Sequence, residues 1–286
     1  MKEDSTTLYD LCLSALASQD ERERISICLS QVDSEGNEVR SFILNGSVPR
    51  YSASLVKVFW AVQALYDLEL NEYLAEEIRN MLIHSSDKAG QNVVDLLINP
   101  QPLSTELNDE IEFENCYQER LKLEHFWEIR GFTALKAAHK TFLHEYDKVD
   151  QWIKLNKSAN SLTACEMTLF WQKAWQANSQ VNGLFKSTQT RNFFFDCLKR
   201  TPRRINFKPE DKDFQSSLIA FNLPESSTVF GKSGWLNEVI NDSVLLPLPN
   251  GGFVTLTIMC AIGEARGINY IRDIGAQLLN NLMQNK

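Results

Sequence analysis

The sequence has no hydrophobic run of the length that a membrane-spanning helix needs. Residues 1–5 (MKEDS) contain no basic stretch that leads into an apolar one, so we expect no signal peptide in the sequence as written. A chain of this kind is predicted to have no transmembrane segment. We expect it to be either cytoplasmic or an exported protein whose leader has been removed.

Metal-binding motifs are also missing. No CxxC pair and no Cys/His spacing typical of a metal site occurs, and the histidines are too irregularly spaced to make one (His84, His125, His139 and His144). We therefore expect no metal and no cofactor, and structural or surface roles for the histidines. The cysteines are scattered through apolar segments and are interpreted as buried thiols, which favours a reducing compartment: Cys12, Cys28, Cys116, Cys165, Cys197 and Cys260.

Positive charge is in deficit. The chain carries 29 Lys and Arg against 37 Asp and Glu, a formal net charge of -8. Because phosphate backbones are bound by clustered basic residues, we expect no nucleic-acid partner. One basic cluster occurs, and it is interpreted as a solvated loop or as an anchor for an anionic partner: Lys199, Arg200, Arg203 and Arg204.

The 286 residues, 43% of them hydrophobic, are enough for one large domain or two closely joined lobes. Hydrophobic periodicity predicts helices at residues 5–17, 55–68, 72–82, 89–98, 126–143, 163–178 and 268–283. It predicts strands at residues 25–29, 41–44, 227–230, 244–248 and 253–259, the last two joined by a Pro-Asn-Gly-Gly turn. The acidic, weakly patterned residues 100–124 are expected to form an exposed insertion.

This order of elements predicts an α+β fold, in which an antiparallel sheet is built from both chain ends and carries flanking helices. We expect one domain over residues 1–286. Its α/β lobe would take residues 1–50 and 215–286, and an all-helical lobe would take residues 51–214. A cleft between two such lobes is a natural place for a substrate.

Ser54 and Lys57 are the first candidates for chemistry. A serine hydroxyl needs a base to act as a nucleophile. At the start of a helix, residues three apart share a face, so Lys57 can reach the Ser54 hydroxyl. Burial beside Val56, Val58 and Phe59 would make the neutral form of Lys57 more accessible. The S-x-x-K pattern alone also fits a helix cap with a surface lysine.

Two further motifs follow in order. Ser86-Asp87-Lys88 comes after a short predicted helix, and Lys232-Ser233-Gly234 is expected at the end of a strand. S-x-x-K, S-D-N and K-T-G occur together in penicillin-binding proteins and class A β-lactamases. Together with residues 51–57, 81–92 and 231–235, they make the chain resemble this family of serine hydrolases. The resemblance covers nearly the whole chain and is weakest over residues 99–160.

The resemblance implies a role for each matching residue. Ser54 attacks a carbonyl and becomes acylated, Lys57 acts as general base or proton relay, and Ser86 passes a proton to the leaving nitrogen. Lys232 supplies positive charge for a substrate carboxylate, and Ser233 hydrogen-bonds the substrate.

It also implies an oxyanion hole from the backbone N–H groups of Ser54 and Trp235, next to Gly234 of the third motif. Asn92 would brace the cleft. Lys88 stands where the family has Asn and where its members touch the substrate. Because an ammonium only donates hydrogen bonds, Lys88 would either help to lower the pKa of Lys57 or block ordinary substrates.

A second departure concerns deacylation. The family has an acid in an E-x-x-L-N pattern, whereas here Leu155-Asn156 would place Trp152 at that position. Glu145, Asp147 and Asp150 lie upstream and would serve only after rearrangement of the loop. Glu166 is interpreted instead as the capping-box partner of Thr163 at a helix start. The sequence therefore predicts a long-lived acyl-enzyme.

The resulting hypothesis is a serine hydrolase that acts on a β-lactam, a peptidoglycan-like amide or a small ester. The first alternative is a non-catalytic binding or regulatory relative that keeps the fold. A second is a covalent sensor that acylates without turnover. A third is a glutaminase, which also uses S-x-x-K, but the third motif and the terminal hairpin favour the β-lactamase pattern.

Overall fold

The computed structural model describes residues 10, 12, 14, 18–98, 110–141, 148–176, 183–202 and 216–284. The chain divides into two compact units, which are described separately. The sheet unit takes its residues from 1–48, 163–176 and 198–286. The helical unit takes its residues from 49–162 and 177–197.

The sheet unit contains a seven-stranded sheet in the order β2-β1-β9-β8-β7-β5-β6. Its strands are β1 (Ile25–Val32), β2 (Glu38–Leu44), β5 (Lys199–Pro202), β6 (Ser216–Ser217), β7 (Val229–Leu236), β8 (Val239–Pro247) and β9 (Phe253–Cys260). All pairings are antiparallel except that of β5 with β6. Because β1 lies between β2 and β9, the two ends of the chain share one sheet, which confirms the predicted α+β class.

The predicted hairpin is the β8–β9 pair. The Leu248 N–H donates to the Gly252 carbonyl at 2.8 Å, and the Gly252 N–H donates to Asn250 Oδ1 at 3.1 Å. Gly251 has φ +87°, a conformation that costs glycine little. The Pro-Asn-Gly-Gly signal therefore marks a real turn.

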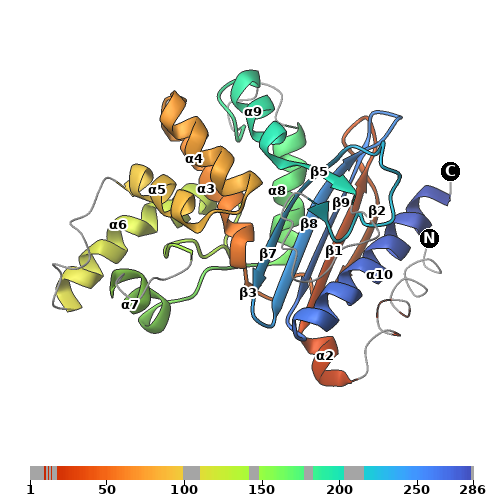
Figure 1. Cartoon of the computed structure of the whole chain (residues 1–286), viewed down its shortest axis with the longest axis horizontal. Coiled ribbons are helices and arrows are strands. Elements are labelled where there is room, and N and C mark those ends of the chain that lie inside the picture. Colours follow the sequence, from red (N-terminus) through yellow and green to blue (C-terminus); the bar gives the residue numbers. More distant parts are fainter. Residues whose placement is uncertain are drawn as a thin grey trace. The chain divides into compact units, whose positions relative to one another are not determined.

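Helices cover both faces of the sheet, α10 (Glu264–Gln284) on one and α8 (Ala164–Gln176) on the other (Figure 1). Strand β1 shows how the sequence separates the faces. Ile25, Ile27 and Leu29 belong to the hydrophobic cluster that α10 completes. The alternate residues, Ser26 and Ser30 among them, point to the α8 side, as the two-residue period of a strand requires.

The position of α8 corrects the predicted lobe boundary, which assigned residues 51–214 to the helical lobe. The Trp171 Nε1–H donates to Ser243 Oγ at 2.7 Å and the Thr168 hydroxyl donates to the Cys28 carbonyl at 3.1 Å, so α8 packs on the sheet. The predicted capping box is present, because Glu166 N–H donates to Thr163 Oγ1 at 3.0 Å and Thr163 N–H donates to Glu166 Oε2 at 3.2 Å. Helix position along a chain does not reveal which layer the helix covers.

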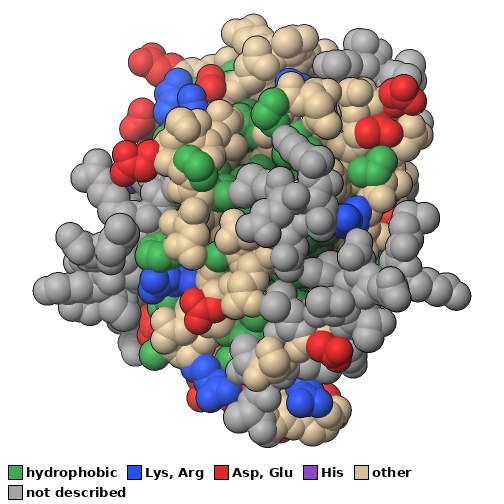
Figure 2. Space-filling model, turned by 90° about the vertical axis from the view of Figure 1, so that its right-hand side faces the viewer, with side chains coloured by type: hydrophobic (Ala, Val, Ile, Leu, Met, Phe, Trp, Pro, Cys, Tyr) green, Lys and Arg blue, Asp and Glu red, His purple; other side chains and the backbone are tan. Residues whose placement is uncertain are grey.

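The basic cluster was in part misread as a loop. Lys199 and Arg200 lie in β5, and Arg200 is buried with an exposed fraction of 4%. Arg203 and Arg204 fall outside the described residues. On the face drawn in Figure 2, the described basic and acidic side chains are interspersed rather than grouped by sign.

The helical unit is built from a 3-10 turn and six helices among the described residues. They are η1 (Ala53–Leu55), α3 (Val56–Asp67), α4 (Glu72–Ile83), α5 (Asp87–Ile98), α6 (Glu110–Glu128), α7 (Lys148–Asn156) and α9 (Thr188–Leu198, up to Cys197 in this unit). A short strand pair joins β3 (Arg50–Tyr51) to β4 (Ser161–Leu162). Helix α3 is central, since every residue from Val56 to Leu65 is buried. None of the described helices is long and apolar enough to cross a membrane.

Helix α6 departs from the prediction of an exposed insertion at 100–124 followed by a helix at 126–143. The helix runs from Glu110 to Glu128 and buries Cys116, Leu123 and Trp127. It ends before Gly131, which has φ +90° and whose N–H donates to the Glu128 carbonyl at 2.9 Å. The many charged residues of α6 hid its apolar stripe.

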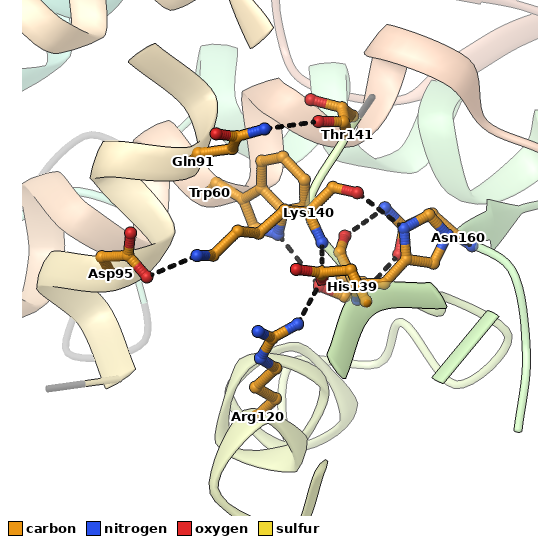
Figure 3. A network of polar contacts seen from close by, with 10 residues as sticks. Trp60, Gln91, Asp95, Arg120, His139, Lys140, Thr141 and Asn160 are labelled. Atoms are coloured by element: carbon orange, nitrogen blue, oxygen red, sulfur yellow. Dashed lines mark hydrogen bonds and ion pairs between the residues drawn. The ribbon is translucent and has the colours of Figure 1, made fainter. Parts of the chain in front are cut away.

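A polar network holds the non-helical residues that follow α6 (Figure 3). The Trp60 Nε1–H of α3 donates to the Ala137 carbonyl at 3.1 Å. His139 Nε2 accepts from the Asn160 N–H at 2.7 Å, and its Nδ1 lies 2.7 Å from the Lys140 carbonyl. Because Nε2 accepts, the ring is neutral with its proton on Nδ1. The network ties this segment to the helix that carries Lys57.

Burial lowers the pKa of His139 to about 4. The unfolded chain takes up this proton near pH 6.5, so the stability that the neutral ring provides is lost as pH falls from about 6.5 to about 4, by about 3 kcal/mol in total. We expect His139→Gln to flatten the pH dependence of urea unfolding across this range. The exposed His84→Gln should keep the wild-type slope. An equal slope in His139→Gln would contradict the assignment.

Candidate functional site

Ser54 lies on a strained turn at the start of α3. It is half-buried in the η1 turn, and Ala53 directly before it has φ +45°. A positive φ is unusual for alanine, and such strain persists where the surroundings fix it, often at functional sites. The turn therefore presents the hydroxyl at the N-terminal end of a fully packed helix.

Lys57 follows one turn later and its side chain is 0% exposed. Its Nζ donates to the Ser85 carbonyl at 2.6 Å and to Asp87 Oδ1 at 2.6 Å. Lys57 was expected to reach the Ser54 hydroxyl. Among the described residues, however, Lys57 Nζ makes no hydrogen bond to that hydroxyl. Lys57 instead connects the first motif to the second.

The second motif is shifted by one residue from its predicted register. Ser86 Oγ accepts from the Ala89 N–H at 3.2 Å and caps α5, and Lys88 is exposed. Ser85 is buried with φ +55°, and Asp87 forms the ion pair with Lys57. The contacts to Lys57 thus come from Ser85-Ser86-Asp87 rather than from Ser86-Asp87-Lys88.

The electrostatics of Lys57 also differ from the expectation based on Lys88. Burial lowers the pKa of Lys57, as predicted from its apolar neighbours. The Asp87 carboxylate opposes this by favouring the ammonium. Asp87 is the residue that sequence reasoning overlooked, although it lies inside the quoted motif at the first position of a helix.

Lys232 and Ser233 lie within β7 of the sheet unit, not at its end as predicted. Lys232 is buried and its Nζ donates to the Ser233 carbonyl at 2.7 Å. Among the described residues, β7 pairs with β5 through Val229 and Phe230. The motif therefore lies beyond that short pairing, with β8 alongside it.

Ser233 is anchored by a buried carboxylate that the sequence analysis did not single out. Its hydroxyl donates to Asp242 Oδ1 at 2.8 Å, opposite it on β8. Asp242 Oδ2 accepts from the Ser217 hydroxyl and the Ile219 N–H, each at 2.9 Å. Burial raises the pKa of Asp242, whereas these donors lower it. Because the hydroxyl proton of Ser233 is bonded to Asp242, the Ser233 oxygen can act only as a hydrogen-bond acceptor toward another group.

Gly234 and Trp235 continue β7 opposite Asn241 and Ile240. Gly234 is buried, and Trp235 is half-buried and packs against the hydrophobic cluster of the sheet unit. The preceding Gly231 is required sterically, because a Cβ there would lie 2.9 Å from the Ser243 carbonyl oxygen.

Two of the acids considered for deacylation, Asp150 and Glu166, are engaged elsewhere. Asp150 is fully buried, forms an ion pair with Arg120 and accepts from the Lys140 N–H at 2.6 Å. Glu166 caps α8, as described above. Trp152, at the position expected for the acid, packs beside Phe113 with ring centroids 6.0 Å apart. Glu145 and Asp147 lie outside the described residues.

No group of three or more potential metal ligands occurs among the described residues. His84 and His125 are exposed, His139 is structural, and His144 lies outside the described part of the chain.

Replacing Asp87 tests the electrostatic account of Lys57. Since the carboxylate favours the ammonium, Asp87→Asn should lower the midpoint of Lys57 titration, measured by NMR of its labelled side chain. Lys88→Asn, which alters the adjacent exposed residue, should leave the midpoint unchanged. A midpoint that moves in Lys88→Asn but not in Asp87→Asn would refute the observed register.

Known proteins resemble this chain in fold. The structure of the TLA-3 extended-spectrum β-lactamase has a TM-score of 0.66 at 12% identity, with 97% of this chain and 99% of that chain covered. The class A β-lactamase from Mycobacterium abscessus has a TM-score of 0.61 at 13% identity, with 96% and 99% covered. A variant of PBP-A in its acyl-enzyme complex with penicillin G has a TM-score of 0.59 at 16% identity, with 98% and 97% covered.

At these identities the structures show a shared fold. The sequence matches no curated protein significantly. Residues 115–282, more than half of the chain, match the family described as the Beta-lactamase enzyme family, and this match begins after Ser54 and Lys57. The chain therefore belongs to the β-lactamase enzyme family.

Proposed function

We propose that this protein is a serine acyl-transfer enzyme that forms an ester on Ser54. The observation that carries the proposal is Lys57, a wholly buried lysine one helical turn from Ser54 whose Nζ contacts the second motif. Ala53 and Ser85 give independent support. They have positive φ without being glycine, and they lie on the two turns that Lys57 connects.

In the proposed step, the Ser54 oxygen attacks a carbonyl carbon and its proton passes to the neutral form of Lys57. Burial lowers the pKa of Lys57 and so increases the population of that form. The carbonyl–nitrogen bond then breaks, and the leaving nitrogen receives a proton. We assign that delivery to Ser85 rather than Ser86, because the Ser86 oxygen caps α5.

The roles of the third motif remain proposals from family resemblance. Lys232 supplies positive charge for a substrate carboxylate, and Ser233 presents an oxygen that accepts from the substrate. Its hydrogen bond to Asp242 supports this, because the bond fixes the direction of that oxygen. Gly234 and Trp235 are proposed to contact substrate through the backbone of β7.

The proposed substrate is a β-lactam, a peptidoglycan-like amide or a small ester, and release of the acyl group is slow. Support for slow release is local: Asp150 and Glu166 are committed to an ion pair and a helix cap, and Trp152 occupies the expected acid position. The PBP-A variant, a structural relative, was captured as an acyl-enzyme with penicillin G.

One observation favours the second candidate, a non-catalytic relative. Asp87 stabilises the ammonium form of Lys57, and an ammonium cannot accept the serine proton. In that case the ion pair would be a structural bridge between α3 and α5.

Intact mass after exposure to penicillins, cephalosporins and activated esters separates the two candidates. We expect a stable adduct of one acyl group on the wild-type chain and none on Ser54→Ala. Digestion should place the group on the peptide that contains Ser54. A folded wild-type chain that gains no mass and consumes no substrate would favour the non-catalytic relative.

The shifted register gives a matched pair of variants. Ser85→Ala should slow acylation by about 10²- to 10⁴-fold, the usual contribution of a positioned proton donor. Ser86→Ala should acylate at close to the wild-type rate and lose about 1 kcal/mol of stability with the α5 cap. Stopped-flow acylation and urea unfolding measure both effects. The opposite order of rates would restore the predicted register.

A further inference from the structure

Strand β1 and helix α8 are joined by a polar seam within the sheet unit. On the α8 side of β1 lie Ser26, Cys28 and Ser30, alternating with core residues. The Gln172 Nε2–H of α8 donates to Ser30 Oγ at 2.7 Å. The Thr168 hydroxyl, one turn earlier, donates to the Cys28 carbonyl.

Cys165 continues this seam by one more turn. Residues 165, 168 and 172 share one face of a helix, so Cys165 faces β1 at the level of Cys28. Each thiol shifts the pKa of the other, and both cysteines are free. Two neighbouring thiols from separate elements therefore lie on this seam.

The backbone around Cys165 makes room for its sulfur. The Cys165 N–H donates to the Gly46 carbonyl at 3.0 Å, and a Cβ at Gly46 would lie only 2.7 Å from Cys165 Sγ. Cys28 is 6% exposed, whereas Cys165 is partly exposed. A reagent from solvent thus reaches Cys165 first, with Cys28 directly behind it.

We propose that Cys165 and Cys28 form a peroxide-reactive thiol pair, with Cys165 as the attacking sulfur and Cys28 as the resolving thiol. The Cys165 thiolate attacks one oxygen of hydrogen peroxide. The O–O bond breaks, Cys165 becomes a sulfenic acid, and the departing hydroxide takes a proton to give water. The Cys28 sulfur then attacks Cys165, and its proton leaves with the sulfenic hydroxyl as a second water. Two thiols are oxidised to one disulfide, and one peroxide is reduced to two waters.

The surroundings favour the thiolate on Cys165. The hydrogen bond from Cys28 is the largest influence and, with one from Ser47, lowers the pKa of Cys165 to about 7. Burial and the carboxylates of Glu166 and Glu38 oppose this. The pKa of Cys28 is raised, because it donates to Cys165 and is buried. The partly exposed Cys165 sulfur is thereby the nucleophile, and the buried Cys28 sulfur keeps its proton until it attacks Cys165.

Peroxide treatment of the reduced full-length chain, followed by non-reducing peptide mapping, tests the pair without any variant. We expect a cross-link between the peptides that contain Cys28 and Cys165, with loss of two hydrogens and full reversal by dithiothreitol. Its rate should rise with pH through about 7 and level off by about 8.5, whereas an ordinary thiol gains reactivity beyond that range. Absence of the cross-link, or oxidation of Cys165 to the sulfinic acid in the wild-type chain, overturns the proposal.

Variants assign the two roles. Cys28→Ser should accumulate a Cys165 sulfenic acid that dimedone traps, and Cys165→Ser should leave Cys28 reduced. Cys116→Ser, which removes a buried thiol from α6, should form the Cys28–Cys165 cross-link at the wild-type rate, as should Ser54→Ala. Far-UV circular dichroism confirms that each variant is folded. Trapping at Cys28 in Cys165→Ser would reverse the assignment and contradict the proposal.

Discussion

The buried amine of Lys57 is the constraint around which the helical unit is arranged. A lysine with no exposed surface carries a large desolvation cost unless its charge is paired and its N–H groups are bonded. The Ser85 carbonyl and the Asp87 carboxylate meet this need, each at 2.6 Å. The positive φ of Ser85 turns the chain there, before α5 begins at Asp87. The first turn of α5 is thus fixed by a side chain from α3.

The sheet unit also contains buried polar groups that need hydrogen-bond partners, and it pairs them in a different way. Its α10 face is apolar apart from the buried Asp242 and the hydroxyls bonded to it, whereas its α8 face joins helix to sheet through hydrogen bonds of polar side chains. Trp171 illustrates the arrangement, since its ring is fully buried and its N–H still reaches Ser243. Such a seam fixes the position of α8 more specifically than apolar contact does, because a displaced helix would leave buried donors unpaired. It also brings Cys165 to Cys28.

The sequence predicted the fold where local patterns are strong. The α3 run, the Pro-Asn-Gly-Gly hairpin and the Thr163–Glu166 capping box each follow from a short, unambiguous signal. Helix α6 was missed because its charged residues mask the buried positions. The layer that α8 covers depends on long-range packing, and no local pattern reports it. The third motif was predicted at the end of a strand, but Lys232 lies within β7.

The candidate site shows a finer limit. The motif reading found Ser54, Lys57 and the serine-rich turn, but its one-residue error moved attention from Asp87 to Lys88. On a helix, a shift of one residue rotates a side chain by about 100°, enough to exchange a buried contact for an exposed one. Only the start of α5, fixed by the Ser86 cap, decides between them.

The exchange of Asp87 for Lys88 reverses the sign of the charge next to Lys57. A cation there would destabilise the ammonium and favour base catalysis. A carboxylate instead stabilises the ammonium and raises the pKa of Lys57, against the effect of burial. Whether the hydroxyl of Ser54 finds an acceptor therefore depends on how these two opposing influences balance at one nitrogen. The Asp87 side chain is 41% exposed, so a bound substrate could exclude water from it. That exclusion would strengthen the ion pair and would also raise the desolvation cost of the two charges. The protonation state of Lys57 therefore depends on the substrate complex as much as on the free protein.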